Sequence, residues 1–205
     1  MTIKIYETER LYVRPFTKED MEGNYKLWWT DQEVTRYNAH GLFPYTKGQM
    51  EAFLARLESS SDIVWAVIAK YHPKKGQRLI KHDCQTRYFQ DVDGLHIGNI
   101  TLQNINWINR SCEFAVVMGE KEYWNKGYCT EAATLLFDHG FNKLNLNRIW
   151  TGTASTNMGM RKVAEKLGMA WEGTFGEATF LEGKYVDVIE YGLLKKEWNR
   201  IKGKE

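Results

Sequence analysis

The sequence has 205 residues, 43% of them hydrophobic and 14% aromatic, which is enough to bury the core of one domain. Its formal net charge of +2 gives no strong attraction to nucleic acid. No apolar run approaches the roughly 18–20 residues that span a membrane, and the charged, alternating amino terminus is unlike a signal peptide. The three cysteines (Cys84, Cys112 and Cys129) form no CxxC pair, so we expect a reduced, cytoplasmic protein without a metal.

Cap and turn residues divide the first third of the chain into strands and helices. Pro15 ends an alternating segment that is typical of a strand, and Thr17, with Asp20 three residues later, is a candidate helix cap. Thr46 caps the next amphipathic segment, which turns Met50 and its apolar neighbours inward. We therefore expect strands at 9–16 and 62–71 and helices at 18–29, 31–37 and 47–60.

The rest of the chain alternates between strands and helices after a polar stretch. Residues 72–94 are polar and aperiodic, and we expect a hairpin insertion there rather than a separate domain. Strands are expected at 95–107, 111–119, 147–154, 170–181 and 184–194, and helices at 126–143 and 157–167. The turn Glu182-Gly183 joins the last two strands into a hairpin. This order predicts a single α/β domain over residues 1–205, with a mixed, mostly antiparallel sheet of about seven strands flanked by helices.

An unusual helix start follows the strand at 111–119. The segment "WNKGYCTEAATLLFDHGF" opens its helix with Lys126 and Gly127 instead of a Ser, Thr or Asp cap. The N–H groups of residues 126–130 then lack partners inside the helix, and the helix dipole adds partial positive charge. Gly127 permits close backbone approach and Lys126 adds a cation, so the turn is suited to bind a pyrophosphate. Neither a Walker A loop nor G-x-G-x-x-G is present, and an ordinary helix start is the alternative.

Five segments carry motifs whose order and spacing are more specific than any one of them. They are "ETERLYVRPF", "HIGNITL", "WNKGYCTEA", "ASTNMGMRKVAEKLGM" and "EGTFGEATFLEGKYVDVIEYGLL". Together they resemble the GNAT superfamily of acetyl-CoA-dependent N-acetyltransferases, and most of all the Rim-type enzymes that acetylate ribosomal proteins. Residues 124–129 match the family motif Gln/Arg-x-x-Gly-x-Gly/Ala, and the resemblance covers nearly the whole chain except residues 72–94.

The resemblance implies that acetyl-CoA is the cosubstrate and that no metal takes part. The pyrophosphate would bind the N–H groups of Lys126, Gly127, Tyr128, Cys129 and Thr130. The pantetheine arm would lie beside residues 114–118, paired with the backbone of Val116, Val117 and Met118, where the family's sheet splays from the strand at 148–153. Asn157 matches an asparagine that binds the cofactor near its thiol end. Arg161 and Lys166 would lie near the nucleotide portion, unless either is simply a surface cation.

Direct attack on the thioester needs a neutral amine and a polarised carbonyl, and a positioned base adds roughly 10²–10⁴-fold. A backbone N–H near Val116 to Met118 could polarise the carbonyl. Glu113 is the first candidate base, because many GNAT enzymes hold a glutamate there that deprotonates the amine through water. A carboxylate paired with Arg110 or a lysine is the structural alternative. Glu177 is the second candidate, because it lies two residues before Thr179, where Rim-type enzymes place a glutamate.

The leaving thiolate needs a proton donor, and the usual one is missing. Met160 stands where Rim-type enzymes have a serine, and a thioether cannot donate a proton. Tyr128, Tyr185 or water therefore remain as candidate acids.

Acceptor-binding residues are expected in the segment after the first helix, where the family builds its acceptor pocket. The candidates are Trp29, Arg36, Tyr37 and Phe43. A protein N-terminus is the leading acceptor, and an amino sugar (free or nucleotide-linked), a polyamine or an aminoglycoside are alternatives. A catalytically silent acyl-CoA-binding module is an alternative of another class. We expect no nucleic-acid or membrane partner, and both a monomer and a homodimer stay open.

Overall fold

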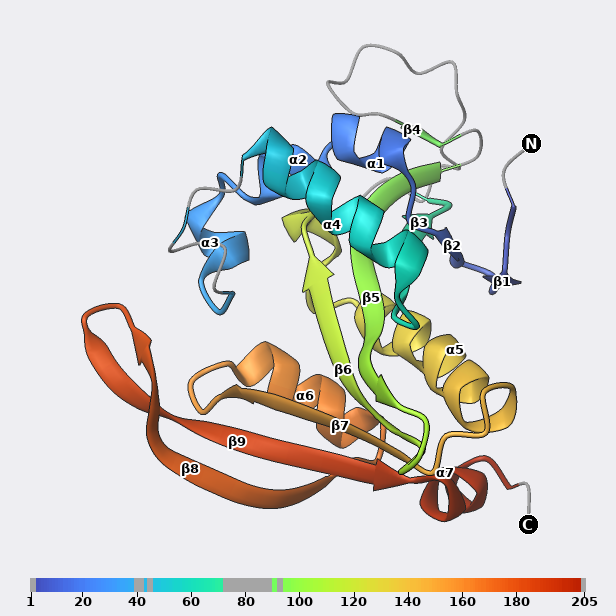
Figure 1. Ribbon diagram of the computed structural model, residues 1–205, viewed down its shortest axis with the longest axis vertical. Helices are drawn as coiled ribbons and strands as arrows, with labels where there is room; N and C mark the ends of the chain where they lie inside the picture. The colour runs from blue at the N-terminus through green and yellow to red at the C-terminus, as the bar shows by residue number, and fades with distance from the viewer. Residues whose placement is uncertain (1–2, 39–42, 44–45, 72–89, 92–93, 204–205) are drawn as a thin grey trace. The chain divides into compact units, whose positions relative to one another are not determined.

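The computed structural model describes residues 3–38, 43, 46–71, 90–91 and 94–203. Its strands follow the order β1-β2-β3-β5-β6-β7-β9-β8, with β4 paired to β5 (Figure 1). The chain divides into two compact units. Unit 1 comprises Met1–Thr101 and Val116–Ala132, and unit 2 comprises Leu102–Ala115 and Ala133–Glu205. Strands β5 (Gly94–Asn106) and β6 (Ser111–Met118) and helix α5 (Tyr128–Asn142) contribute residues to both units.

The amino-terminal strands of unit 1 are antiparallel. Its strands, besides the parts of β5 and β6, are β1 (Tyr6–Glu7), β2 (Leu11–Pro15), β3 (Ile63–Ala69) and β4 (Gln90–Asp91). β2 pairs with β3 from Leu11 opposite Ala69 to Pro15 opposite Trp65. The central residues of both strands are buried, which explains why β3 is almost continuously apolar in sequence.

Four α-helices of unit 1 surround an aromatic cluster. They are α1 (Lys18–Glu22), α2 (Tyr25–Trp28), α3 (Gln32–Thr35) and α4 (Lys47–Ser59), and α1, α2 and α4 are neighbours in Figure 1. Phe16, Met21, Tyr25, Trp28 and Met50 form the buried cluster between them. The cap prediction at Thr46 is confirmed, because its Oγ1 accepts the N–H of Gln49 at 3.3 Å.

The helix predicted at 18–29 is in fact two short helices separated at Gly23 and Asn24. Gly23 leaves the helical region, with φ −85° and ψ −145°. Asn24 is buried, and its Nδ2 donates to Glu120 Oε1 at 3.0 Å, which is a contact between distant parts of the sequence. The apolar spacing alone carries no sign of this break.

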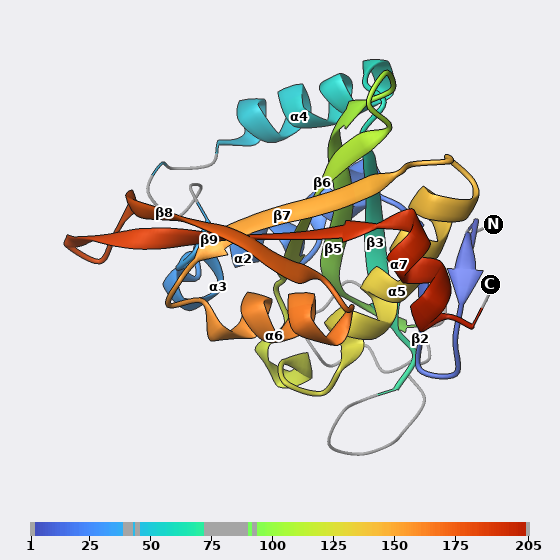
Figure 2. The ribbon, with the colours of Figure 1, turned by 90° about the horizontal axis from the view of Figure 1, so that it is seen from below.

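Unit 2 is built from the remaining strands and three helices. Its elements are the other parts of β5, β6 and α5, with β7 (Arg148–Ala154), α6 (Met158–Lys166), β8 (Ala170–Leu181), β9 (Lys184–Leu194) and α7 (Lys195–Ile201). Helix α6 lies along β7 in both views, and α7 follows the end of β9 (Figures 1 and 2). Phe137 packs edge-on against Phe114 of β6 and also contacts Trp198 of α7. The sequence interpretation missed α7, which has only seven residues.

Two neighbouring strands of unit 2 pair over a short stretch only. β6 and β7 are parallel, with Ser111 opposite Arg148 and Glu113 opposite Trp150. β7 continues to Ala154 and is paired there with Val188 of β9. The sheet is therefore mixed, as predicted, because β6 and β7 are parallel whereas β7 and β9 are antiparallel.

The hairpin of β8 and β9 is the most exposed part of unit 2. β8 forms one end of the strand order, and most of its residues are exposed (Figure 2). A bulge places residues 176–178 opposite Asp187, between the pairs Phe175–Val188 and Thr179–Val186. The hairpin turn at Glu182-Gly183 is confirmed.

The structure confirms the predicted fold class, with two differences in detail. The described residues form nine strands rather than about seven, because β1 and β4 have only two residues each and leave no periodic signal. Of the predicted insertion, Gln90 and Asp91 pair with β5, and residues 72–89 and 92–93 lie outside the described residues. The single-domain prediction is untested. In the described part of the chain, no helix has the length and apolar character needed to cross a membrane.

Candidate active site

The predicted pyrophosphate-binding turn is formed by residues 124–127 of unit 1, before the first turn of α5. Asn125 and Gly127 both have left-handed backbones, with φ 58° and 83°. The Gly127 carbonyl accepts the N–H of Glu131 at 3.0 Å, which begins the helical hydrogen bonding. N–H groups of the first helical turn have no carbonyl one turn earlier to bind, so they are suited to hold an anion.

The side chains around this turn are held by several contacts. Lys126 is exposed, and its ammonium donates to the Glu122 carbonyl at 2.7 Å. Tyr128 is buried, with its ring 5.2 Å from the ring of Tyr123. Burial raises the pKa of Tyr128, so the phenol stays protonated at neutral pH. That charge state suits a proton donor.

Cys129 is half-buried, and desolvation raises the pKa of its thiol to about 12. A thiol with so high a pKa is a poor nucleophile at neutral pH, so a packing role fits Cys129 better than a chemical one. The Cys112 thiol is buried and free, and Cys84 lies outside the described residues.

Arg10 links the amino-terminal strands to the turn. Its NH1 donates to the Lys126 carbonyl at 3.1 Å, and its Nε donates to Glu131 at 2.8 Å. Its guanidinium also lies over the Tyr128 ring, 4.6 Å from the centroid. Arg10 belongs to the quoted segment "ETERLYVRPF", but no local property of that segment predicts contacts with residues more than a hundred positions away.

The strand residues expected beside the pantetheine arm are half-buried at the end of β6. Val117 packs against the aromatic cluster of unit 1. The Met118 carbonyl accepts the indole N–H of Trp124 at 2.7 Å, so this carbonyl already has one protein donor. Val116 and Val117 keep their predicted role as a proposal.

Glu113, the first candidate base, is held by two amides of unit 2. Gln103 Nε2 and Asn104 Nδ2 donate to its Oε2 at 3.1 and 2.8 Å. The alternative interpretation predicted a cationic partner instead. Phe114 faces α5, so the neighbouring Glu113 points to the opposite face of this sheet.

Glu177, the second candidate base, lies in the exposed bulge of β8. Its φ of 50° is left-handed, and its N–H donates to Asp187 Oδ1 at 2.8 Å. Tyr185, a candidate acid, is 65% exposed and packs edge-on against Phe180. Bulges of this kind redirect side chains and are frequent next to active sites.

Asn157 is the N-cap of α6 in unit 2. Its Oδ1 accepts the N–H of Met160 at 3.1 Å, and its Nδ2 donates to Thr153 Oγ1 at 3.1 Å. Arg161 donates to the Ser155 carbonyl and to the Tyr191 hydroxyl, at 3.1 and 3.3 Å, so its side chain is engaged within unit 2. Lys166 is exposed in the last turn of α6.

The expected acceptor residues lie in a region that is described only in part. Trp29 is half-buried and packs against Tyr25 in the aromatic cluster of unit 1. Arg36 and Tyr37 are exposed, with the guanidinium 5.3 Å from the ring. Phe43 is 69% exposed, and its neighbours 39–42 and 44–45 lie outside the described residues. The described residues do not gather these four side chains into one pocket.

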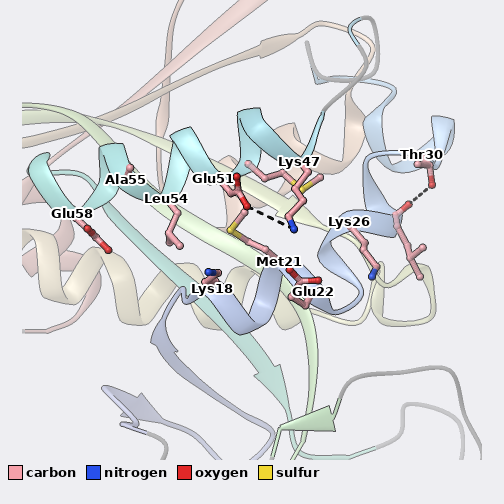
Figure 3. Close-up of a pocket in the computed structure, with 12 residues that line it drawn as sticks. Lys18, Met21, Glu22, Lys26, Thr30, Lys47, Glu51, Leu54, Ala55 and Glu58 are labelled. Atoms are coloured by element: carbon pink, nitrogen blue, oxygen red, sulfur yellow. Dashed lines mark hydrogen bonds and ion pairs between the residues drawn. The ribbon is translucent and has the colours of Figure 1, made fainter.

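A groove of about 720 Å³ runs instead between α4 and the α1–α2 segment of unit 1. Figure 3 shows Met21 and Leu54 beneath a rim that carries Lys47 and Glu51, which form an ion pair at 3.8 Å. Lysines and glutamates both line this groove. The lining residues are Lys18, Met21, Glu22, Lys26, Leu27, Thr30, Lys47, Met50, Glu51, Leu54, Ala55 and Glu58.

Glu120 is a notable carboxylate that the sequence interpretation missed. It follows β6 by two residues and is half-buried in unit 1. Asn24 Nδ2 and Trp28 Nε1 donate to its Oε1 at 3.0 and 2.9 Å. Burial raises its pKa, although these two bonds act in the opposite direction. The only signal in the sequence is an acidic residue directly after the strand, in "MGEKEYW".

Comparison with known proteins identifies the family. The sequence matches the family model of the Acetyltransferase (GNAT) domain over residues 10–170, so the chain belongs to this family. YdaF of Bacillus subtilis (strain 168), provisionally named a ribosomal N-acetyltransferase, is 35% identical over 106 residues, or 52% of this chain and 57% of YdaF. The spermidine N(1)-acetyltransferase of Escherichia coli (strain K12) is 30% identical over 118 residues, or 57% of this chain and 63% of that protein.

A solved structure supports the fold over almost the full length. The spermidine N-acetyltransferase from Vibrio cholerae, crystallised with CoA and spermine, has a TM-score of 0.73 at 22% identity. The match covers 93% of this chain and 99% of that chain.

Family and fold together define the protein as an acetyl-CoA-dependent N-acetyltransferase. The chain's own geometry fits acetyl-CoA, because Gly127 has a left-handed backbone at the start of α5, where an anion can approach the N–H groups. Across the described ranges, no group of three or more His, Cys, Asp or Glu side chains could hold a metal ion.

Proposed function

We propose that the protein acetylates the amine of a protein N-terminus, using acetyl-CoA bound at the turn before α5. The observation that carries the cosubstrate assignment is this turn, with Gly127 at φ 83° and Lys126 beside it. The protein acceptor is supported by the similarity to YdaF. It is also supported by the exposed hairpin of unit 2, where Phe175, Phe180 and Tyr185 are all more than half exposed. Such a surface suits a polypeptide better than an enclosed small molecule.

In this proposal the backbone N–H groups of residues 126–130 bind the pyrophosphate, and the backbone of residues 116–118 binds the pantetheine arm. Asn157 binds the cofactor near its thiol end, and Lys166 contributes charge near the nucleotide. The amine nitrogen forms a bond to the thioester carbon, the carbon–sulfur bond breaks, and coenzyme A leaves as a thiolate. One proton is lost from the amine and one is gained by the thiolate.

Glu113 is the proposed base, acting through a water molecule. The amides of Gln103 and Asn104 fix its Oε2 through hydrogen bonds and so orient the carboxylate. Glu177 is the competing choice, because the bulge and its positive φ orient it away from a regular strand. Tyr128 is the proposed acid, since its raised pKa keeps the proton on the phenol.

A polyamine is the second candidate acceptor. The similarity to the spermidine N(1)-acetyltransferase supports it, and so does Glu120, a half-buried carboxylate whose two hydrogen bonds both fall on Oε1. A carboxylate in such surroundings could hold one ammonium group of a polyamine while another reacts. The groove of Figure 3 favours neither acceptor, because lysines and glutamates both line it and their charges balance.

The test is release of free thiol from acetyl-CoA with a panel of amines. The panel contains ribosomal-protein N-terminal peptides, spermidine, amino sugars and an aminoglycoside. We expect turnover with the peptides, and turnover with spermidine alone would instead select the polyamine. Binding of CoA without turnover of any amine would indicate the silent acyl-CoA-binding module.

Three variants identify the base in the same assay. Glu113→Gln is expected to lower kcat by roughly 10²-fold or more, as for loss of a general base. Glu177→Gln should retain most of the activity. Glu165→Gln, an exposed carboxylate of α6, is the matched control. A large loss in Glu177→Gln with an active Glu113→Gln would reverse the assignment.

A further inference from the structure

The Lys126 carbonyl is oriented by a residue from the other end of the sequence. Arg10 NH1 donates to this carbonyl at 3.1 Å. The Gly127 N–H lies in the same plane as this carbonyl, because the two groups belong to one trans peptide. In a trans peptide these two groups point in opposite directions. Holding the carbonyl towards Arg10 therefore turns the Gly127 N–H away from Arg10.

Arg10 is itself fixed by a carboxylate in the first turn of α5. Its Nε donates to Glu131 Oε2 at 2.8 Å, and its NH2 bonds the same oxygen. Thr8 Oγ1 occupies the other oxygen, Oε1, at 2.5 Å. Both Glu131 oxygens are thus used within unit 1, and the Arg10 charge balances the carboxylate that lies near the proposed anion site.

The backbone segment that carries Arg10 is hydrogen-bonded to the neighbouring strands. The Thr8 carbonyl accepts a hydrogen bond from the ammonium of Lys70 at 2.5 Å, and the Thr8 N–H donates to the Leu11 carbonyl at 2.8 Å. Lys70 is buried and follows β3 directly. The Arg10 backbone is bonded as well, since its carbonyl accepts the Lys70 N–H at 2.9 Å. Arg10 therefore extends from a backbone that is anchored on the β2–β3 ladder.

We propose that Arg10 is a positioning residue for acetyl-CoA, which holds the Lys126 carbonyl so that the Gly127 N–H is directed at the pyrophosphate. This inference rests on the proposed function of the turn. The geometry also explains why residue 127 is a glycine. The peptide that Arg10 orients leads into a left-handed backbone at this residue, with φ 83°, which glycine adopts without strain. Arg10 does not need to touch the cosubstrate for this role.

The test compares two acetyl donors that differ at the pyrophosphate. Acetyl-CoA carries it, whereas S-acetyl-pantetheine ends before it. We expect Arg10→Gln to raise the KM for acetyl-CoA about tenfold, as for one hydrogen bond to a charged group, with kcat at saturation nearly unchanged. The KM for S-acetyl-pantetheine should not change. Arg56→Gln, which breaks the 2.9 Å ion pair with Asp62 in the same unit, is the matched control and should leave both KM values unchanged.

A second variant separates orientation from charge and guards against misfolding. Arg10→Lys keeps the positive charge, but a single ammonium lacks the planar fork that reaches Glu131 and the Lys126 carbonyl together. We expect it to raise the KM for acetyl-CoA as Arg10→Gln does. Full affinity in Arg10→Lys, or equal losses for both donors, would overturn the positioning role. If the unaltered protein bound both donors equally well, the turn would not be the pyrophosphate site. That result would contradict the proposed function itself and not only the role of Arg10.

Discussion

Backbone conformation at single residues shapes the proposed cosubstrate site. Asn125 and Gly127 both have left-handed backbones directly before α5 begins. An asparagine tolerates this region better than most residues, and glycine adopts it without strain. The turn therefore leads into a helix start whose first N–H groups have no partners within the helix.

Gly127→Ala should weaken acetyl-CoA binding. A Cβ there would lie 3.5 Å from Arg10 NH2, an ordinary contact, so the cost comes from the φ of 83°. A left-handed backbone costs a residue with a Cβ about 1–2 kcal/mol. If the turn relaxes to avoid this cost, we expect the Kd for acetyl-CoA to rise roughly tenfold. Isothermal titration of the variant with acetyl-CoA measures the change.

The control for this prediction is Gly48→Ala in α4, where a Cβ meets nothing within 4 Å. Alanine is favoured over glycine in a helix by about 1 kcal/mol, so this variant should be slightly more stable. Its Kd for acetyl-CoA should be unchanged. A Gly127→Ala protein with unaltered affinity would show that the turn does not bind the cosubstrate through its left-handed form.

Glu120→Gln should change how stability depends on pH. Burial raises the pKa of Glu120, so the folded state binds this proton more tightly than the unfolded chain does. The natural protein therefore loses stability as pH rises from the ordinary value of 4.5 through the raised pKa. Glutamine keeps an acceptor for Asn24 and Trp28 but does not titrate. We expect the variant to equal the natural protein below about pH 4.5 and to have the larger free energy of unfolding at pH 7.

Urea titrations at pH 4.5 and pH 7 measure this difference. A variant that is less stable than the natural protein at pH 7 would mean that the charged carboxylate is needed by its two donors. Glu165→Gln, on the surface of α6, provides a control that should follow the natural protein at both pH values.

Some side chains that cap helices are also candidate functional residues. Asn157 closes the first turn of α6 through Met160 and is joined to β7 through Thr153. One amide therefore serves both the helix and the strand before it. A role in acetyl-CoA binding would add to this structural role, and the two can be separated by substitution.

Asn157→Ala should cost about 1 kcal/mol of stability, because the helix loses its cap. Asn157→Ser restores a capping hydroxyl and should recover most of that loss. If Asn157 also binds acetyl-CoA, the serine variant will keep a raised KM although its stability is restored. Thermal unfolding and steady-state kinetics of both variants measure the two effects. A serine variant as unstable as the alanine variant would contradict the capping role.

The stability of the whole molecule in acid should depend on a buried ion pair of unit 1. Burial by itself would raise the pKa of Asp20. Two hydrogen bonds from Arg14, together with the charge interaction with His96, instead bring this pKa below its ordinary value. Burial lowers the pKa of His96, and its contact with Asp20 offsets this only in part. His96 Nε2 also lies 2.8 Å from Asn99 Oδ1, so the ring is enclosed by polar partners.

The sign of both shifts predicts acid sensitivity. The folded protein binds these protons less tightly than the unfolded chain does, so stability is lost as pH falls. The loss begins below 6.5, the ordinary value for His96, and continues below 3.8, the ordinary value for Asp20. His96→Gln should flatten the first part of this decline in urea titrations between pH 7.5 and 5. If stability changed between pH 7.5 and 5 in the same way in His96→Gln as in the natural protein, the assignment to His96 would be contradicted.

Local signals in the sequence were enough for most elements. The cap at Thr46, the hairpin turn Glu182-Gly183 and the helix start at Tyr128 depend on residues within a few positions of one another. Helix caps and turns are short-range physics, so one sequence suffices to predict them. The same reasoning missed the break at Asn24, which depends on a partner far along the chain, and the strands β1 and β4, which have only two residues each.

By itself, the sequence determined the order of the longer strands and helices, the glycine turn before α5 and, through motif resemblance, the family. Tertiary structure alone decided which side chains surround those motifs. Arg10 reaches Lys126 and Glu131, Glu120 is held by Asn24 and Trp28, and the Glu113 carboxylate is bonded by amides instead of a cation. The physical reason is that periodicity and capping report on neighbours in sequence. Pairing, burial and the resulting pKa shifts arise only after distant segments have packed together.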